Sequence, residues 1–494
     1  MTRLVLILCS SLLLSQTLSA AERPNIILMM ADDLGYGDTG FTGHKIIRTP
    51  HLDQMARDGA VLTHFHAGGP VCSPTRGTFV TGRHNFRYGI FGANVGHLPK
   101  QEITLAEIAK EKGYTTGHFG KWHLGTLHPE RSSKGAARKP RENYSPAAWH
   151  GYDQSFVVES SIATWTDPEA KQKKRKNPKK DQESGGNPFY QNGKALDGND
   201  PSLKGGAGKI VMDRALPFIA AAAERKQPFL AVIWFNAPHA PVVASPSLHQ
   251  SYTDQGVADG PAHYYGCITE MDQQIGRLRS ELKRLGVAEN TWIKFTSDNG
   301  PEGKQSSAEV DGLSGSKARY AGVTSGLRGR KRSLYEGGVR VPTVSVWPGR
   351  IAAGSVLAAP SSTLDYLPTI AELLGYTMPD KRPIDGVSLL PLFSPSPVQF
   401  SRSQPIPFLH RGTATLIDGD FKLVVRALGA SGRDELFHLG QDRTESSNVI
   451  EDHPERALKM REHLLRFIDS AKHSHAGVDY RDPTFKPVDP WPTL

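Results

Sequence analysis

Cysteine is scarce in this chain of 494 residues, which contains three. Cys9 lies in an apolar N-terminal segment, so Cys72 and Cys267 could form at most one disulfide elsewhere, and a disulfide-rich scaffold is excluded. Long apolar runs are also missing beyond that segment, since no later stretch approaches the roughly 20 apolar residues that a membrane span needs. We therefore expect a globular protein with a hydrophobic core and no membrane span.

The N-terminal segment has the pattern of a secretory signal peptide. Arg3 supplies a positive charge, residues 4–14 are largely apolar, and small residues follow at 19–21. Cys9 lies inside the apolar part rather than after it, which argues against a lipid anchor. We predict that residues 1–21 are a signal peptide and that the mature chain is exported, either to the periplasm or outside the cell.

The excess of positive charge is concentrated in one place. Lys and Arg outnumber Asp and Glu by 59 to 50, a net charge of +9, and seven of these cations lie in residues 171–180. Because the remainder of the chain is nearly balanced, its composition does not favour nucleic acid as a partner. A solvated loop is the usual explanation of such a run, and steering of an anionic polymer is the alternative.

Short apolar runs alternate with helical patterns from Pro24 onward, which predicts an α/β fold. We expect a large mixed, mostly parallel sheet sandwiched by helices. The predicted buried strands are residues 25–30, 115–119, 229–235, 292–296 and 339–347. The predicted helices are residues 52–60, 104–112, 210–223, 263–285 and 363–374, and Thr104 with Glu107 forms a capping box at the start of the second.

Composition divides the chain into a main domain of residues 22–390 and a smaller C-terminal α+β subdomain of residues 391–494. Residues 128–206 have little periodicity and are predicted to be a long insertion of loops. A Pro- and Ser-rich stretch, residues 391–407, precedes the tail. In the tail we expect strands at 413–417, 421–425 and 435–439 and a helix at 454–471.

Polar clusters follow three of the predicted strands. They are Asp32-Asp33, Asn236 to His239, and Asp298-Asn299. Each alone is explained by a turn or a helix cap, but ligands of α/β sheets gather at the carboxyl ends of strands, so three together indicate a site. The oxygen ligands of Asp32, Asp33, Asp298 and Asn299 suit a hard cation, calcium before magnesium. Zinc is disfavoured because no His or Cys accompanies these carboxylates in a suitable pattern.

Cys72 begins the string Cys-Ser-Pro-Thr-Arg-Gly. A lone cysteine at a helix start could be a thiol with a lowered pKa, and His123 or His239 could serve it as a base. Residues 72–76, with Thr-Gly-Arg at 81–83, have a more specific match: they resemble the signature of the type I sulfatases of the alkaline-phosphatase superfamily.

Further motifs carry the same resemblance in the family's order. Residues 120–125, 236–239 and 297–300 are similar to later sulfatase motifs, and so is Lys331 within residues 329–338, although it is flanked by arginines where the family usually has glycines. The resemblance covers residues 24 to about 375. It implies that residues 22–390 form a catalytic domain that hydrolyses sulfate esters. The predicted export and the basic run at 171–180 favour a sulfated carbohydrate over a small phenol ester as the substrate.

The resemblance also implies roles for individual residues. Cys72 would be converted to formylglycine by a formylglycine-generating enzyme, and one calcium ion would be held by the four oxygen ligands named above. The remaining expected roles are Arg76 to orient the formylglycine hydroxyls, Lys121 and Lys331 to bind the sulfate, His239 as acid for the leaving alkoxide, and His123 as acceptor of the second hydroxyl's proton.

Two alternatives remain open on sequence alone. A phosphonate or phosphate monoester hydrolase could share the fold, because phosphate and sulfate are both tetrahedral. A catalytically silent carbohydrate-binding protein belongs to another class, and the intact Cys72, Arg76, Lys121 and Lys331 argue against it.

Overall fold

The computed structural model describes residues 23–167, 187–303, 318–394, 400–426, 428 and 434–493. The predicted signal peptide and the basic run at 171–180 lie outside the described residues. Within the described part of the chain, no helix has both the length and the apolar composition needed to cross a membrane.

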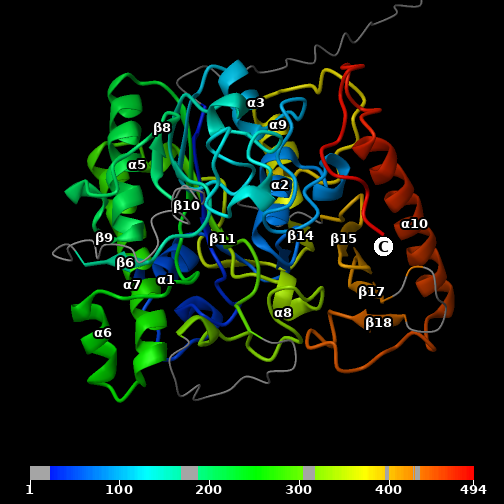
Figure 1. Cartoon of the computed structure of the whole chain (residues 1–494). Helices are drawn as coiled ribbons and strands as arrows, with labels where there is room; N and C mark the ends of the chain where they lie inside the picture. Colours follow the sequence, from blue (N-terminus) through cyan, green and yellow to red (C-terminus); the bar gives the residue numbers. More distant parts are fainter. Residues whose placement is uncertain are drawn as a thin grey trace, which may run out of the picture.

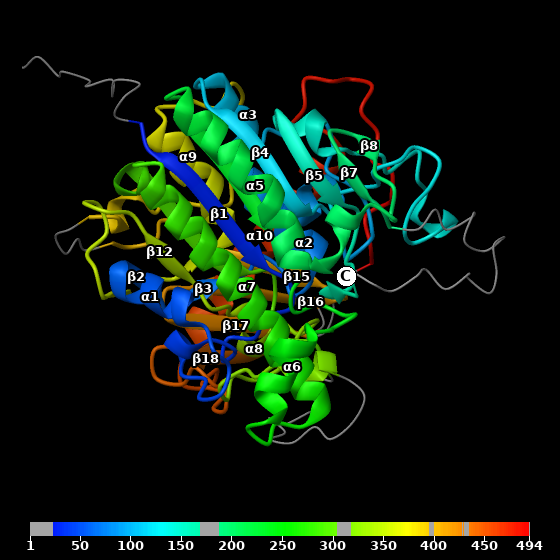
Figure 2. The same cartoon turned by 90° about the vertical axis from the view of Figure 1, so that its left-hand side faces the viewer.

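The centre of the main domain is a mixed sheet of ten strands (Figure 2). Five neighbouring strands, β11, β1, β10, β4 and β5, are parallel, and antiparallel pairs occur towards both edges. In spatial order the strands are β13 (Ser355–Leu357), β2 (Ala60–Leu62), β12 (Val344–Val346), β11 (Thr291–Ser297), β1 (Asn25–Ala31), β10 (Phe229–Trp234), β4 (Thr115–Lys121), β5 (Gln154–Val158), β7 (Phe189–Gln191) and β8 (Lys194–Ala195).

Both faces of this sheet are buried. Along β1, Ile26 and Leu28 pack into one hydrophobic cluster, while Ile27 and Met29 pack into the cluster on the opposite face. This double burial explains the nearly continuous apolar sequence of the central strands. Helices α2 (Cys72–Thr81), α3 (Leu105–Glu111) and α9 (Tyr366–Leu373) cover the first face, and α1 (Pro50–Asp58), α5 (Ala207–Glu224) and α7 (Asp259–Arg284) cover the second (Figures 1 and 2).

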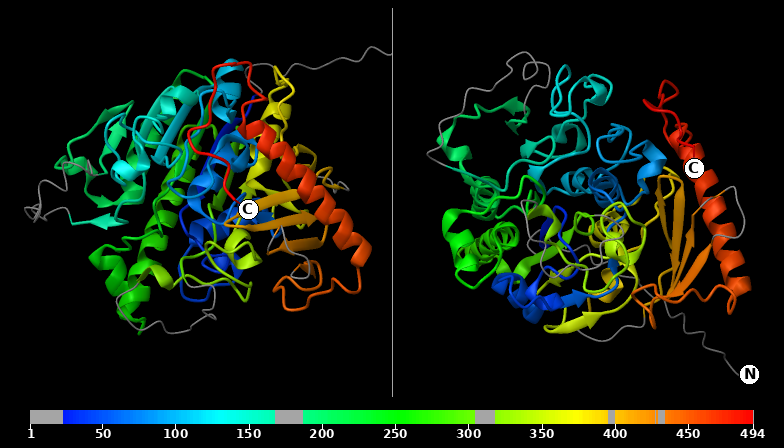
Figure 3. Two further views of the ribbon diagram at one scale, coloured as in Figure 1. Left: turned by 45° about the vertical axis from the view of Figure 1, so that its right-hand side comes forward. Right: turned by 60° about the horizontal axis from the view of Figure 1, so that its bottom comes forward.

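The C-terminal part forms a four-stranded antiparallel sheet, in the order β15 (Ile406–His410), β16 (Thr413–Asp418), β17 (Phe421–Val425) and β18 (Glu435–His438). Helix α10 (Pro454–His475) lies along one face of this sheet (Figure 3). The other face packs against the main domain, where Phe408 and Val424 meet Leu334 and Val339. The predicted fold class, including a C-terminal α+β subdomain, is therefore confirmed.

Three predictions of local structure were wrong. The strand expected at 339–347 contains β12 only, because Glu336–Val339 is the short helix α8 and Pro342 cannot donate a ladder hydrogen bond. Strand β15 begins inside the stretch predicted to be a linker, and its Pro407 is tolerated because β15 is an edge strand. The helix expected to reach Ala60 ends at Asp58, and Ala60 begins β2.

The segment 128–206 was also predicted incorrectly, since it is not made of loops alone. It contributes β5, β7 and β8 to the main sheet, and Phe156, Val157 and Val158 are buried there. These strands are only two to five residues long and are surrounded by Gly, Pro and Asn, which hid their apolar pattern. The capping box of Thr104 and Glu107 is present at the start of α3.

Candidate active site

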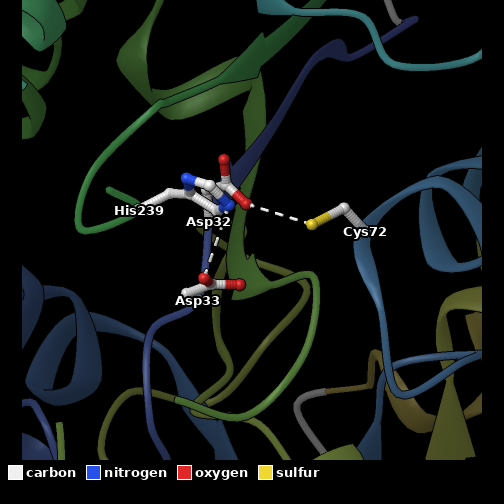
Figure 4. Close-up of side chains that lie close together, drawn as sticks. All are labelled: Asp32, Asp33, Cys72 and His239. Carbon is white, nitrogen blue, oxygen red and sulfur yellow. Dashed lines mark hydrogen bonds and ion pairs between the residues drawn. The ribbon is translucent and has the colours of Figure 1, made fainter. Parts of the chain in front are cut away.

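Four parallel strands deliver polar side chains to one edge of the central sheet. Asp32 and Asp33 follow β1, Lys121 ends β4, and Asp298 and Asn299 follow β11. Asn236 and His239 follow β10. Helix α2 begins beside these strand ends with Cys72, and Figure 4 shows Cys72 and His239 turned towards Asp32 and Asp33. The structure thus brings together residues that lie up to 267 positions apart along the chain.

Asp32 lies at the centre of the cluster and is fully buried. Lys121 Nζ donates to its Oδ2 over 2.7 Å, and Arg76 Nη2 lies 3.6 Å from its Oδ1. Burial alone would raise the pKa of Asp32, but the charges of Lys121, His239 and Arg76 outweigh burial and hold this pKa well below its ordinary value. Asp32 is therefore a carboxylate at neutral pH.

Asp33 is held by a second lysine. Lys331 Nζ donates to Oδ1 and Oδ2 over 2.6 and 2.7 Å, and Asn299 Nδ2 donates to Oδ1 over 2.8 Å. Burial alone would lower the pKa of Lys331, but Asp33 and other nearby acidic groups outweigh burial and raise this pKa above its usual value. The ammonium therefore stays charged. The backbone of Asp33 is left-handed, with φ of 69°, and its N–H donates to Asp298 Oδ1 over 3.1 Å.

Arg76 and Asp298 form a buried pair. Arg76 Nη2 and Nε donate to Asp298 Oδ2 over 2.7 and 3.2 Å. Burial and the neighbouring Asp32 raise the pKa of Asp298 to about 6, against the lowering effect of Arg76. Since the three carboxylates at positions 32, 33 and 298 face the three cations at positions 76, 121 and 331, their formal charges balance.

Cys72 occupies the first position of α2 and is buried as a free thiol. Its Sγ lies 3.5 Å from Asp32 Oδ1, as drawn in Figure 4. Burial and the charge of Asp298 raise the pKa of Cys72, despite the opposing effect of Lys121. The unmodified thiol is therefore protonated and a weak nucleophile, which argues against the simple thiolate hypothesis.

No histidine or cysteine accompanies the carboxylates in a suitable pattern along the sequence, but the fold brings one of each to them. His239 Nε2 lies 3.7 Å from Asp33 Oδ2, and one ligand atom from each of Asp32, Asp33, Cys72 and His239 falls within 4.8 Å of the others. The residues lie far apart in sequence and meet only through the sheet. His239 Nδ1 donates to the carbonyl oxygen of Ala240 over 2.7 Å, which leaves Nε2 as the nitrogen that faces Asp33.

His123 follows Lys121 by two residues and has a defined tautomer. Its Nε2 donates to Asn94 Oδ1 over 2.8 Å, and its buried Nδ1 has no hydrogen-bond partner in the described structure. Burial, together with the charges of Lys121 and Arg76, lowers the pKa of His123 well below its usual value. The ring is thus neutral at pH 7, and its free Nδ1 can accept a proton.

Several buried polar atoms at the site have no partner among the described residues. They are Asn299 Oδ1, Arg76 Nη1, and both side-chain heteroatoms of Asn236. Unpaired buried polar groups are rare in proteins and indicate a missing ion, water or ligand. Asn299 Oδ1 is a hard oxygen donor beside three carboxylates, so the donor set at positions 32, 33, 298 and 299 fits a hard divalent cation.

Two residues near the site were missed by the sequence analysis. Ser161 Oγ donates to Asp32 Oδ2 over 3.1 Å. Lys134 is exposed, but desolvation and the nearby charge of Lys121 lower its pKa, which places it close to the site. Both residues belong to the segment predicted to be loops. A serine and a lysine in a polar stretch give no signal in a single sequence, because their importance comes from the folding of that segment over the site.

The mixed sheet carries its acids and cations at the carboxyl ends of its parallel strands. This is the alkaline-phosphatase-like fold, which similar solved structures of hydrolases share. The chain belongs to the sulfatase family of this fold class, since the family model described as Sulfatase matches residues 24–376.

Relatives and solved structures agree with this assignment. The chain is 33% identical to mouse steryl-sulfatase over 429 residues and 33% identical to mouse N-acetylgalactosamine-6-sulfatase over 389 residues. These alignments cover 76% and 75% of the chain but 65% and 66% of the two relatives. The crystal structure of Ps i-CgsB in complex with k-i-k-neocarrahexaose is similar over 93% of the chain and 97% of that structure, with a TM-score of 0.74 and 26% identity.

Proposed function

We propose that this protein hydrolyses sulfate esters of carbohydrates through a formylglycine made from Cys72 and a bound calcium ion. The observation that carries the proposal is the position of Cys72, whose Sγ lies 3.5 Å from Asp32 in a pocket of buried cations. The relatives include an N-acetylgalactosamine-6-sulfatase, and the similar structure contains a neocarrahexaose, which favours a sugar sulfate as substrate.

The charge balance of the site supports a monoanionic substrate. Three carboxylates and three cations leave the apo site nearly neutral, so one divalent cation would make it net positive. A sulfate monoester bears a single negative charge, which such a site would neutralise without a large excess. Asp32, Asp33, Asp298 and Asn299 would hold the calcium, which supplies Lewis-acid polarisation of a sulfate oxygen.

Conversion of Cys72 to formylglycine would replace a thiol that is a weak nucleophile. A hydrated formylglycine supplies an activated hydroxyl nucleophile and removes the soft sulfur ligand from the metal site. A separate formylglycine-generating enzyme would be needed for this conversion. Arg76, through its unpaired Nη1, would orient the hydroxyls, and Lys121 and Lys331 would bind the sulfate oxygens.

The two histidines would move protons in different steps of the reaction. His239 presents Nε2 to the site and would donate a proton to the leaving alkoxide when protonated. His123 has a free Nδ1 and would accept the proton of the second hydroxyl as sulfate is released. The separate environments of the two rings are consistent with an acid and a base that do not exchange roles.

We also propose that residues 22–390 act as the catalytic domain and residues 391–494 as a smaller subdomain, and that the mature chain is exported after removal of residues 1–21. A phosphonate or phosphate monoester hydrolase is the competing function. Sulfate release from a sulfated sugar, compared with turnover of aryl sulfate, aryl phosphate and aryl phosphonate, tests the proposal. We expect sulfate esters to be hydrolysed with the highest kcat/KM, and a preference for either phosphorus ester would contradict it.

A further inference from the structure

A second positively charged surface lies directly beside Lys331. A cavity of about 670 Å³ separates the loop that carries Lys331 from the C-terminal sheet. We call this cavity the interdomain groove. Its charged and polar lining includes Lys331, Arg332 and Tyr335 from the main domain and His410, Arg411 and Arg426 from the C-terminal sheet and its turn. Because Lys331 contacts both the groove and Asp33, the groove begins at the candidate active site.

The groove carries more positive than negative charge. Arg332 pairs with Glu302, and Arg426 Nη2 lies 2.8 Å from Glu435 Oε2. Arg411 is exposed, and within the described part of the chain its guanidinium makes no ion pair. The groove therefore presents an uncompensated guanidinium next to paired ones, an arrangement that favours an anionic ligand over a neutral one.

His410 gives independent evidence for a ligand. Its side chain lines the groove and is only 6% exposed, yet neither ring nitrogen has a hydrogen-bond partner in the described structure. Burial, with the nearby charges of Arg411 and Arg332, lowers the pKa of His410 to about 4. The neutral ring has one N–H to donate, and a buried donor without an acceptor is unfavourable.

The backbone at two of the arginines that line the groove is unusual. Arg332 has φ of 75° and Arg411 has φ of 47°, both in the left-handed region that favours glycine. A long side chain at such a position is retained at a cost in backbone energy, and strain of this kind gathers at binding sites. Two strained arginines therefore line one groove from opposite sides, Arg332 from the loop of Lys331 and Arg411 from the turn between β15 and β16.

We propose that the interdomain groove binds a second anionic group of the substrate, a sulfate ester or a carboxylate on the sugar unit next to the sulfate that is cleaved. Arg332 and Arg411 pair with this group, and His410 donates its N–H to it. The inference rests on the proposed function and narrows its substrate class to oligosaccharides that carry at least two anionic groups. Lys331 then joins the two subsites, because it lies at the boundary between them.

The test compares substrates that differ only in the second group. Three disaccharides carry the same cleavable sulfate and have either no second anion, a second sulfate or a uronate carboxylate. Arg411→Asn and Arg332→Asn remove the guanidinium groups while keeping a residue that tolerates positive φ. Arg466→Ala is the matched control, because Arg466 is an exposed arginine of α10 outside the groove.

The parent should prefer one or both dianionic disaccharides, and the ratio of kcat/KM for dianionic to monoanionic substrate should fall about tenfold in Arg411→Asn and Arg332→Asn. The preferred second group identifies the anion as sulfate or carboxylate. The ratio should not change in Arg466→Ala. The proposed subsite would be contradicted if the parent hydrolysed all three disaccharides with the same kcat/KM. It would also be contradicted if the ratio of kcat/KM were the same in the parent and in the groove variants.

A binding measurement tests the groove independently of the proposed catalytic function. Titration of the same disaccharides into Cys72→Ala and into Cys72→Ala with Arg411→Asn measures the groove without turnover. We expect about tenfold weaker binding of the dianionic sugar in the double variant, and equal binding would contradict the subsite. If the parent released no sulfate from any ester, the proposed function would be wrong. The titration would still show whether the groove binds a second anionic group.

Discussion

Lys331 Nζ lies 2.6 and 2.7 Å from the two carboxylate oxygens of Asp33, although 298 positions separate the two residues. Lys121 makes the matching contact with Asp32 over 2.7 Å. Each acid that follows β1 therefore has its own buried ammonium. A divalent cation bound between these acids would share their charge with the lysines, so the lysines become free to attract a sulfate group. This relationship would make metal and substrate binding interdependent.

The first prediction concerns the modification of Cys72. Coexpression with a formylglycine-generating enzyme should lower the mass of the peptide that contains Cys72 by about 18 Da, because an aldehyde replaces the thiol. Cys72→Ala should abolish sulfate release, whereas Cys267→Ala, which alters a buried thiol in α7, should retain it. A fully active preparation in which peptide mass spectrometry finds only the thiol would contradict the proposed nucleophile.

The second prediction concerns the metal. Asp298→Ala removes one carboxylate of the donor set and the partner of Arg76, so bound metal and activity should fall together, with kcat/KM at least about 100-fold lower. Asp272→Asn changes another buried carboxylate outside the site and should retain the metal. Elemental analysis of the native protein should find one calcium per chain. Stoichiometric zinc would instead indicate that His239 and the soft ligand set bind the ion.

The third prediction concerns the proton donor. His239→Gln keeps a polar side chain but cannot donate a proton as an acid. We expect kcat/KM to fall by on the order of 100-fold or more for a sugar sulfate, whose alkoxide is a poor leaving group. For an aryl sulfate with an acidic phenol the loss should be about tenfold, because that leaving group needs little protonation. Equal losses on both esters would show that His239 has another role, and His249→Gln, which changes a half-buried histidine outside the site, serves as the control.

The fourth prediction concerns stability and pH. Asp272 is buried in α7 and accepts hydrogen bonds from the backbone N–H groups of His51 and Leu52 over 3.1 and 2.8 Å. Burial raises the pKa of Asp272 to about 7, despite these hydrogen bonds. A carboxyl whose pKa is raised by folding contributes most below its unfolded pKa of about 3.9, and this contribution is lost as pH rises through about 7.

Asp272→Asn removes that titration. Between pH 5 and 8 the free energy of unfolding of the parent should fall by on the order of 2 kcal/mol more than that of the variant. Urea unfolding at several pH values measures the difference. The exposed Asp469→Asn should leave the pH dependence unchanged, and parallel curves for parent and Asp272→Asn would show that Asp272 does not titrate in this range.

The sequence predicted the central strands and the long helices well, because their apolar periodicity is strong. Strand β17 has the predicted bounds, and β1 and β10 differ from prediction by one residue at one end. The errors fall where local pattern is weak. Pro407 marks an edge strand rather than a linker only once the order of the C-terminal sheet is known.

The sequence by itself determined the class of protein and the types of side chain available to its site. Motifs are local strings, and the string from Cys72 to Arg76 or the pair Asp32-Asp33 can be read without coordinates. Only the tertiary structure decided which groups meet: His239 approaches Asp33, Ser161 donates to Asp32, and His410 lies near Arg332 and Arg411. These contacts depend on sheet order, strand register and the packing of the C-terminal sheet. They follow from the burial of apolar surface along the whole chain, which no short segment encodes alone.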